Sequence, residues 1–561
     1  MGIPKLSHHL ASLSESATLG GQHESSEGFK SVVIDGPALV YHVYSTLISR
    51  INPRVGVIDR QPTCNEVSVA VMMYLVLLKV VNVDVRKIYF DGALPLHKRD
   101  TRLSRLERSR KQLEGACKTT RKGHGLVLGN RACSIRPGDL FQGPKFPGNR
   151  SPLPENAFMV SAVIEDLMSR WNLVEIRSNL PENLADIVTY DSDYPWLDIC
   201  EIVPGEADFA CAALTSREHG LAILTSDSDL VVFNLGPSST VIFLNTIYTE
   251  YWCDEDPSRS IIRAMHICPA SISNRLGIHS LPYLAHELNV DSRAGLGELI
   301  RRAKRAYEST HLDSTYVEFM RQYDLRAFTH NLFNASFLQG FDVRLSELFA
   351  QIVWSGEFLD QLPRIYLPFL QEDHSRRCGW AEGSRIRRLA YSLIDKNKTL
   401  DAQYPSITEC TRRGTRFCFD EVTLYSREVI KLEVHRLLDG YKHIQNNHPE
   451  SRGSPLFWRI YALAEIYSNT EENHTYWPDK RDLGRFLGFE KTYDNVGWEE
   501  IHALAQTQSV LYSLRILFQI IRIIPHNNGA VSQLYDCLST LPSLRILMGT
   551  YREVRDEYCG G

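Results

Sequence analysis

The sequence predicts an α/β protein: a parallel sheet with flanking helices, followed by a mostly α-helical C-terminal region. Three observations predict it. Short apolar, β-branched segments alternate with helical patterns over about the first 300 residues. Strands separated by helices are typical of βαβ units, which build parallel sheets. Strand signals become scarce from about residue 305, where long helical patterns take over. A chain of 561 residues corresponds to about two to four domains.

Five segments are predicted to be strands of this sheet. Each is short and nearly continuously apolar, as expected for a parallel strand that helices cover on both faces. They are VVID (32–35), KIYFD (87–91), ICEIV (199–203), AILTSD (222–227) and VIFLN (241–245).

The segments between these strands divide into helical patterns and irregular stretches. Helices are predicted at about 66–82, 96–115, 156–171 and 206–217. Residues 123–155 are rich in Gly and Pro without a period, which predicts an exposed loop or insertion. Further irregular stretches are expected at about 183–198 and in the Ser/Gly-rich segment 14–30.

Two long helices are predicted in the C-terminal region, at 419–441 and 509–525. The apolar stripe of 509–525 is expected to pack in the core rather than bind a partner.

Composition favours a globular protein inside the cell. Hydrophobic residues make up 43% and charged residues 23% of the chain, which excludes a mainly disordered or collagenous protein. The net charge is 62 − 67 = −5, so any nucleic-acid binding must come from a local basic patch. The twelve cysteines include no C-x-x-C pair, which favours reduced thiols over a zinc site. The apolar segment 69–78 is too short to span a bilayer, so no membrane association is expected.

Acidic residues follow the predicted strands at the point where each strand ends. They are Asp35, Asp91, Glu206, Asp208, Asp227 and Asp229. Because ligands of parallel α/β sheets bind beyond the carboxyl ends of the strands, we expect the six carboxylates to converge. Clustered carboxylates repel one another, and divalent cations relieve this repulsion. Oxygen ligands suit Mg²⁺ or Mn²⁺, and two such ions about 4 Å apart would support hydrolysis of a phosphodiester.

Each acidic motif has a structural alternative when taken alone. Asp91 with the following Gly is typical of a turn, and Glu206 is typical of a helix cap. Asp227 and Asp229 are equally consistent with a loop exposed to solvent. The conjunction of all six favours the metal site.

A basic helix is predicted beside the acids. The segment 98–122 carries ten Lys or Arg residues and three acids. Lys98, Arg102 and Arg105 have the spacing of one helix face, which would engage a phosphate backbone. The alternative is a solvated basic helix.

The ordered motifs MGI, VVIDG, YFDG, GEADFACAAL and TSDSDL resemble those of the flap-endonuclease/XPG nucleases. That family has a PIN-like catalytic domain, and the resemblance covers about residues 1–310. LPYLAHELNVD (281–291) and the long helical C-terminal region resemble the asteroid branch. The resemblance implies an XPG N-terminal-like part (1–122), an irregular insertion (123–155), an XPG internal-like asteroid part (156–309) and a helical C-terminal region (310–561).

The resemblance also implies roles for individual residues. The metal-binding acids would be Asp35, Asp91, Glu206, Asp208, Asp227, Asp229 and Asp291, with Asp208 standing where Glu is usual. Lys98 and Arg105, together with Asp35 and Asp91, would be catalytic. Nucleic acid would contact Gly2, Lys98, Arg102, Arg105 and Arg108.

The function that the resemblance implies is that of an endonuclease dependent on two Mg²⁺ or Mn²⁺ ions. It would hydrolyse single-stranded or branched, flap-like DNA, or RNA, with a role in DNA repair and a nuclear location. The alternative is a non-catalytic PIN-like scaffold that binds RNA or protein in post-transcriptional regulation or signalling. The irregular loop after the basic helix motivates it, as does the segment SRAGLGELIRRAKRA after Asp291, where flap enzymes carry a Gly-rich hairpin. A hydrolase of small phosphoesters is less favoured, because the basic helix suits a polymer. The sequence names no protein partner of residues 310–561.

Overall fold

The computed structural model describes most of the chain. The described residues are 3, 5–21, 28–51, 60–93, 98–121, 126–127, 136–142, 153–308, 314–325, 341–353, 362–396, 404–473, 495–524 and 529–554.

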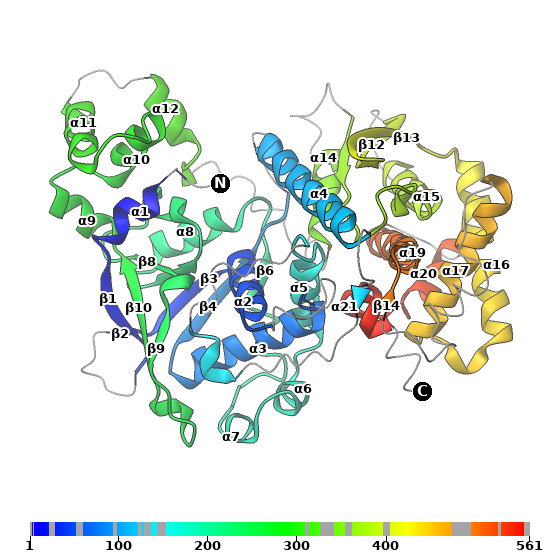
Figure 1. Ribbon diagram of the computed structural model, residues 1–561, viewed down its shortest axis with the longest axis horizontal. Coiled ribbons are helices and arrows are strands. Elements are labelled where there is room, and N and C mark those ends of the chain that lie inside the picture. The colour runs from blue at the N-terminus through cyan, green and yellow to red at the C-terminus, as the bar shows by residue number, and fades with distance from the viewer. Residues whose placement is uncertain are drawn as a thin grey trace.

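A mixed sheet forms the centre of the N-terminal half (Figure 1). Its order is β2-β1-β10-β8-β7-β3-β4-β6, and β9 pairs with β10. The strands are β1 (Glu15–Leu19), β2 (Gly28–Phe29), β3 (Ser31–Asp35), β4 (Asp84–Phe90), β6 (Cys200–Ile202), β7 (Ala222–Thr225), β8 (Thr240–Phe243), β9 (Tyr248–Tyr251) and β10 (Ile261–Ile267).

The five predicted strands are β3, β4, β6, β7 and β8, and they pair in parallel as one continuous block. The predicted fold class is therefore confirmed. The antiparallel extension through β10 and β1 was not predicted. The prediction that residues 14–30 are irregular is therefore partly wrong, because strand β1 lies within this segment. This strand pairs residue by residue with β10. It lacks the apolar pattern used to predict strands, because it contains the polar residues Glu15, Ser16 and Thr18.

Helices cover both faces of the parallel block. Val32 and Ile34 point into a core shared with α2 (Gly36–Arg50), α3 (Cys64–Val80) and α5 (Met159–Ser169). Val33 lies between them and points into a second core, shared with α8 (Ala207–Arg217) and α10 (Leu281–Val290). This alternation is that of a strand buried on both faces.

The four predicted helices of this half are present as α3, α4 (Arg99–Arg121), α5 and α8. The apolar segment 69–78 lies inside α3 and is buried, as expected of a core helix. The remaining helices are α1 (Leu6–Ala11), α6 (Leu173–Ser178), α7 (Glu182–Ala185), α9 (Pro269–Leu276), α11 (Leu296–Glu308) and α12 (Ser314–Arg321).

The C-terminal region is mostly helical, as predicted, and also contains a three-stranded sheet of order β11-β12-β13. Its helices are α14 (Val343–Val353), α15 (Ser384–Lys396), α16 (Arg427–Asn447), α17 (Pro455–Asn473), α19 (Trp498–Ile523), α20 (Ala530–Leu538) and α21 (Leu544–Leu547). Its strands are β11 (Arg364–Tyr366), β12 (Ser406–Arg413) and β13 (Arg416–Thr423).

The helix predicted at 419–441 is wrong over its first eight residues and correct from Arg427 onward. Residues 419–423 belong to β13, and α16 begins at Arg427 after the N-cap Ser426. The alternating exposure of β13, a strand property, was obscured by the apolar pattern that follows it. The segment 509–525 was correctly placed in the core, because nearly all of α19 is buried.

The predicted domain boundaries stay predictions. Only part of the insertion 123–155 lies within the described residues, including β5 (Leu126–Val127), which pairs with β14 (Asn495–Val496).

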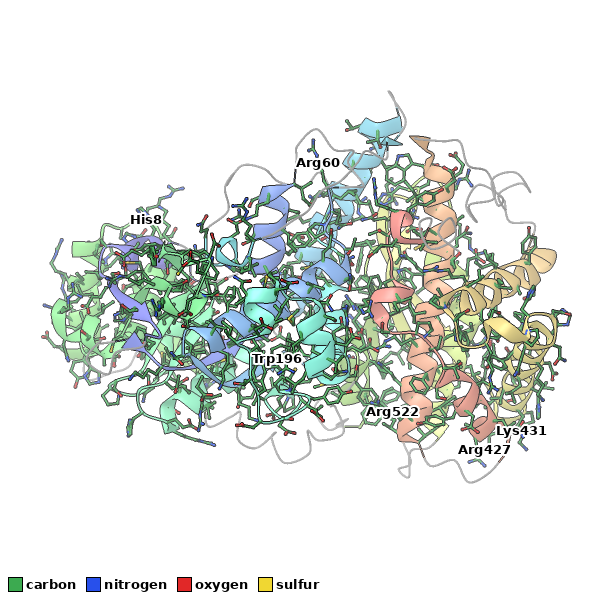
Figure 2. The ribbon with its side chains drawn as sticks, turned by 90° about the horizontal axis from the view of Figure 1, so that it is seen from below. His8, Arg60, Trp196, Arg427, Lys431 and Arg522 are labelled. Carbon is green, nitrogen blue, oxygen red and sulfur yellow. The ribbon has the colours of Figure 1, made fainter. Side chains whose placement is uncertain are left out.

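The C-terminal region packs directly against the N-terminal half. Arg515 of α19 forms an ion pair with Glu165 of α5 at 3.0 Å. Trp498, at the other end of α19, donates its indole N–H to Thr120 of α4 at 2.9 Å. Figure 2 shows the elongated molecule, with His8 at one end and Lys431 of α16 at the other. Among the described helices, none has the length and apolar character needed to cross a membrane.

Candidate functional site

Three short connections carry the predicted acids to one edge of the sheet. Asp35 ends β3 and caps α2, Asp91 follows β4, and Asp227 follows β7. Two glycines allow these connections to lie close to the sheet. A Cβ atom on Gly36 would come within 2.5 Å of the Phe90 ring, and one on Gly92 within 2.0 Å of the Val203 carbonyl oxygen. The Asp-Gly motifs therefore reflect close packing beside each acid.

A cavity of about 670 Å³ lies at this edge. Its lining combines acids from the sheet edge with cations from α4 and the C-terminal region. The charged lining residues are Asp35, Asp91, Glu155, Glu206, Asp208, Asp227, Arg102, Arg105 and Arg344. Five of the predicted metal ligands thus share one cavity with two of the predicted phosphate-binding arginines.

Asp35 is the most deeply buried of these acids, with 6% of its surface exposed. Its carboxylate accepts hydrogen bonds from the Thr225 hydroxyl at 2.7 Å and the Ala38 amide at 3.2 Å. Burial raises the pKa of Asp35 to about 7, and the charges of Asp91 and Asp227 act in the same direction. The carboxyl is therefore held in position but is costly to ionise without a nearby cation.

Asp91 and Asp208 are subject to the same electrostatic cost. Asp91 accepts the Ala207 amide at 2.8 Å, at the start of α8. Burial raises its pKa to about 6, and Glu206 adds to the shift. The pKa of Asp208 is raised well above its ordinary value by burial and by the charges of Asp35 and Asp227. These mutual effects show that the carboxylates lie close together.

Glu206 occupies the N-cap position of α8, but its side chain makes no capping hydrogen bond. It forms an ion pair with Lys98 instead, at 3.4 Å. The helix-cap alternative therefore does not explain why a Glu side chain stands at this position.

Asp229 lies beside the cavity rather than in its lining. Its carboxylate accepts the Ile3 amide at 2.7 Å. Burial raises its pKa to about 6, with Asp227 as the second cause. Burial, followed by the charges of Asp229 and Asp227, also raises the pKa of Tyr323. Gly2, the predicted nucleic-acid contact next to Ile3, lies outside the described residues.

Asp291 is not brought into the cavity. It caps the C-terminal end of α10, accepts the Arg293 amide at 3.1 Å, and pairs with Arg302 of α11 at 3.3 Å. The Arg293 amide and Arg302 hold the pKa of Asp291 below its usual range.

The predicted cations of α4 divide into two groups. Lys98, Arg102 and Arg105 face the acids, since Lys98 pairs with Glu206 and the two arginines lower the pKa of Asp91. Arg108 is exposed and contributes with Lys111 to a different surface pocket. Lys98, just before α4, and Arg102 and Arg105 within it therefore lie on the side of the helix that faces the acids, and their role in binding phosphate stays a prediction.

The C-terminal region supplies part of the site, which the sequence did not indicate. Arg102 forms a close ion pair with Glu347 of α14, and its guanidinium lies 5.1 Å from the Tyr366 ring centroid. Arg99 donates to the Tyr366 hydroxyl at 3.1 Å. No motif marks Glu347 or Tyr366, because only tertiary packing brings them to α4.

The carboxylate oxygens of the cavity suit a divalent cation, but they are not yet arranged as a coordination site. Buried carboxylates that raise one another's pKa need a cation, and hard oxygen donors suit Mg²⁺ or Mn²⁺. In the part of the chain that is described, however, no three acidic, histidine or cysteine side chains are arranged to hold one ion as they stand. Metal binding would therefore require the carboxylates to rotate toward a shared centre.

Comparison with known proteins gave one family match. Residues 155–424 match the family model described as XPG domain containing, a match that joins the later strands of the core to part of the C-terminal region. No curated protein matches. A search of solved structures found similarity to the crystal structure of human GEN1 in complex with Holliday junction DNA. The identity is 14% and the TM-score 0.28, over 76% of this chain and 88% of that one.

Proposed function

We propose that this chain, whose residues 155–424 match the XPG-domain family and its nuclease scaffold, is a divalent-metal-dependent endonuclease. It would hydrolyse phosphodiester bonds in single-stranded or branched, flap-like DNA. The observation that carries the proposal is the cavity in which five acids of the sheet edge face Arg102 and Arg105. A DNA repair role and a nuclear location follow from this activity as parts of the same proposal.

Asp35, Asp91, Glu206, Asp208 and Asp227 would hold two Mg²⁺ or Mn²⁺ ions, with Asp229 beside them. When bound, such ions would activate a water molecule and offset the charge of the scissile phosphate. Asp291, which pairs with Arg302, would join them only after that ion pair opens.

The cations of α4 would bind and orient the substrate phosphate. Arg105 is exposed and lines the cavity, so its guanidinium can reach a phosphate that enters there. Lys98 pairs with Glu206 and its charge lowers the pKa of Asp229, so a phosphate bound nearby would compete with these acids for that charge. Arg105 and Lys98 would thus stabilise negative charge on the reacting phosphate.

The experiment that tests this proposal is a cleavage assay on a panel of labelled nucleic acids. Single-stranded, flap, bubble and duplex forms of DNA and RNA would be incubated with Mg²⁺, Mn²⁺ or EDTA. We expect metal-dependent cutting of the single-stranded or branched DNA. Cutting that persists in EDTA, or an intact panel at high protein concentration, would overturn the proposal.

Removing one carboxylate charge should stabilise the metal-free protein. The raised pKa values mean that the protonated acids favour the fold. This contribution to the stability is fully present below about pH 4 and is lost as the pH rises through about 6 to 7. At pH 8 in EDTA we therefore expect Asp91→Asn to raise the melting temperature by about 2–4 °C.

The same substitution should reduce the stabilisation that Mg²⁺ gives to the wild type, because a ligand is lost. Melting curves with and without Mg²⁺, at pH 5 and pH 8, measure both effects. A variant that melts lower than the wild type in EDTA at pH 8 would contradict the account of the acids.

A non-catalytic scaffold is the second candidate function. It is favoured by the cations that are already paired within the protein, Lys98 with Glu206 and Arg102 with Glu347. A scaffold would bind RNA or protein without hydrolysis, so binding with no cleavage in the assay above would support it.

A further inference from the structure

Part of the cavity is apolar, and the C-terminal region contributes to this part. Val343 lies at the start of α14, while Pro368 and Phe369 follow β11. The core adds Leu106 of α4 and Val160 of α5. The cavity therefore combines carboxylates and arginines with a surface of carbon atoms.

Phe369 is an aromatic side chain of this surface, and it is half-buried. Its ring packs edge-on to that of Phe417 in β13, with the centroids 6.0 Å apart. Tyr366, by contrast, is 7% exposed and already contacts Arg99 and Arg102. Phe369 is thus the C-terminal aromatic ring that a ligand in the cavity can reach.

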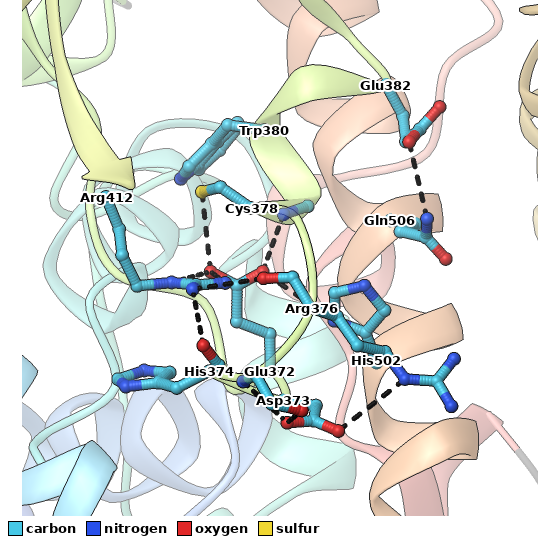
Figure 3. A network of polar contacts seen from close by, with 12 residues as sticks. Glu372, Asp373, His374, Arg376, Cys378, Trp380, Glu382, Arg412, His502 and Gln506 are labelled. Atoms are coloured by element: carbon cyan, nitrogen blue, oxygen red, sulfur yellow. Dashed lines mark hydrogen bonds and ion pairs between the residues drawn. The ribbon is translucent and has the colours of Figure 1, made fainter. Parts of the chain in front are cut away.

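A buried polar network holds the segment that carries Phe369 (Figure 3). Glu372, three residues further along, accepts from Arg412 at 2.9 Å and from the Gly379 amide at 2.6 Å. Trp380 donates its indole N–H to the Pro368 carbonyl oxygen at 2.6 Å. The position of Phe369 is therefore fixed before any ligand binds, which lowers the entropy lost on binding.

We propose that Phe369, with Pro368 and Val343, forms a subsite for one unpaired nucleobase of the substrate strand. The inference rests on the proposed function and adds the part of the substrate that the C-terminal region recognises. A nucleotide joins an anionic phosphate to a flat apolar base. The cavity offers arginines for the phosphate, together with carboxylates that would hold metal ions beside it, and it offers apolar carbon for the base. Aromatic side chains bind single strands by stacking on bases of any sequence.

The size of the cavity supports a single unpaired nucleotide. A volume of about 670 Å³ is typical of pockets that enclose one small ligand. A double helix does not fit into such a space. The subsite formed by Phe369, Pro368 and Val343 therefore selects strands whose bases are already unpaired, or whose bases can be unpaired at the cleavage position.

The test is an abasic scan of a short single-stranded substrate, in which one base at a time is removed. For the wild type we expect KM to rise by about 5- to 100-fold when the missing base is the one that occupies the subsite. Phe369→Ala should raise KM for the intact strand by a similar factor and should be insensitive to the abasic site at that position. Phe369→Leu, which keeps apolar volume without a ring, should behave like Phe369→Ala even if the alanine variant folds poorly.

Phe419→Ala is the matched control. Phe419 is an exposed aromatic residue of β13, and its side chain does not line the cavity. It should retain the wild-type dependence on the abasic site. Equal cleavage of all abasic strands by the wild type, or wild-type dependence in both Phe369 variants, would overturn the subsite while leaving the nuclease intact. A wild type that cuts no nucleic acid would overturn the proposed function and the subsite together.

Discussion

The double substitution Asp227→Asn/Asp229→Asn is expected to abolish metal-dependent hydrolysis while the protein stays folded. Both carboxylates lie at the carboxyl end of β7. Each Asn keeps a side-chain oxygen that can accept the hydrogen bond that the wild-type carboxylate accepts. Those bonds run from the Asp229 amide to Asp227 and from the Ile3 amide to Asp229, at 2.9 and 2.7 Å. The loss of two charges removes the attraction for a divalent cation, so activity should fall by at least about 1,000-fold.

The chain contains a matched control for this variant. Asp191, Ser192 and Asp193 repeat the Asp-Ser-Asp sequence in an exposed stretch outside the cavity lining. Asp191→Asn/Asp193→Asn makes the same change in net charge and should cut nucleic acid like the wild type. The assignment of the acids is wrong if the two double variants have equal activity.

The second large effect is expected on stability, from Glu372→Gln. Glu372 and Arg412 form an ion pair at 2.9 Å, with side chains 1% and 0% exposed. The guanidinium of Arg412 also donates to the carbonyl oxygens of His374, Arg376 and Gly414, so it cannot turn toward water. Removing the carboxylate leaves a buried unpaired cation, which costs about 3–5 kcal/mol. Urea or thermal unfolding measures the loss.

Glu250→Gln provides the comparison for Glu372→Gln. Glu250 pairs with Arg263 at 2.8 Å on the surface, where both side chains are more than a third exposed. Exposed pairs contribute about 0–1 kcal/mol, so this variant should unfold almost like the wild type. Similar losses for the two variants would contradict the role given to the buried network.

The parallel block of the sheet was predictable because its strands are buried on both faces. Such strands are short apolar segments, and the five that the sequence indicates pair with one another without interruption. Strands β12 and β13 were not predictable in the same way. Arg412 and Glu409 of β12 look like surface residues in sequence but are buried through pairing with Glu372 and Arg387. Pairs made by distant segments leave no local pattern.

The acids of the site were predictable from their positions after strands, but their surroundings were not. The sequence placed Asp35, Asp91 and Asp227 at one edge, and the structure brings them to one cavity. Asp291 was grouped with them on the resemblance alone, and the structure pairs it with Arg302. Glu347, Tyr366 and Phe369 come to the cavity through the packing of the C-terminal region, which no spacing in the chain encodes.

Direct titration of Mn²⁺ tests the central claim, that the acids of the sheet edge form a divalent-metal site. Bound and free Mn²⁺ can be distinguished by electron paramagnetic resonance at pH 8, which lies above the raised pKa values of Asp35 and Asp91. The account predicts about two ions per wild-type chain. It predicts loss of this binding in Asp227→Asn/Asp229→Asn and retention in Asp191→Asn/Asp193→Asn. A wild type that binds no Mn²⁺, or equal binding by all three proteins, would contradict it.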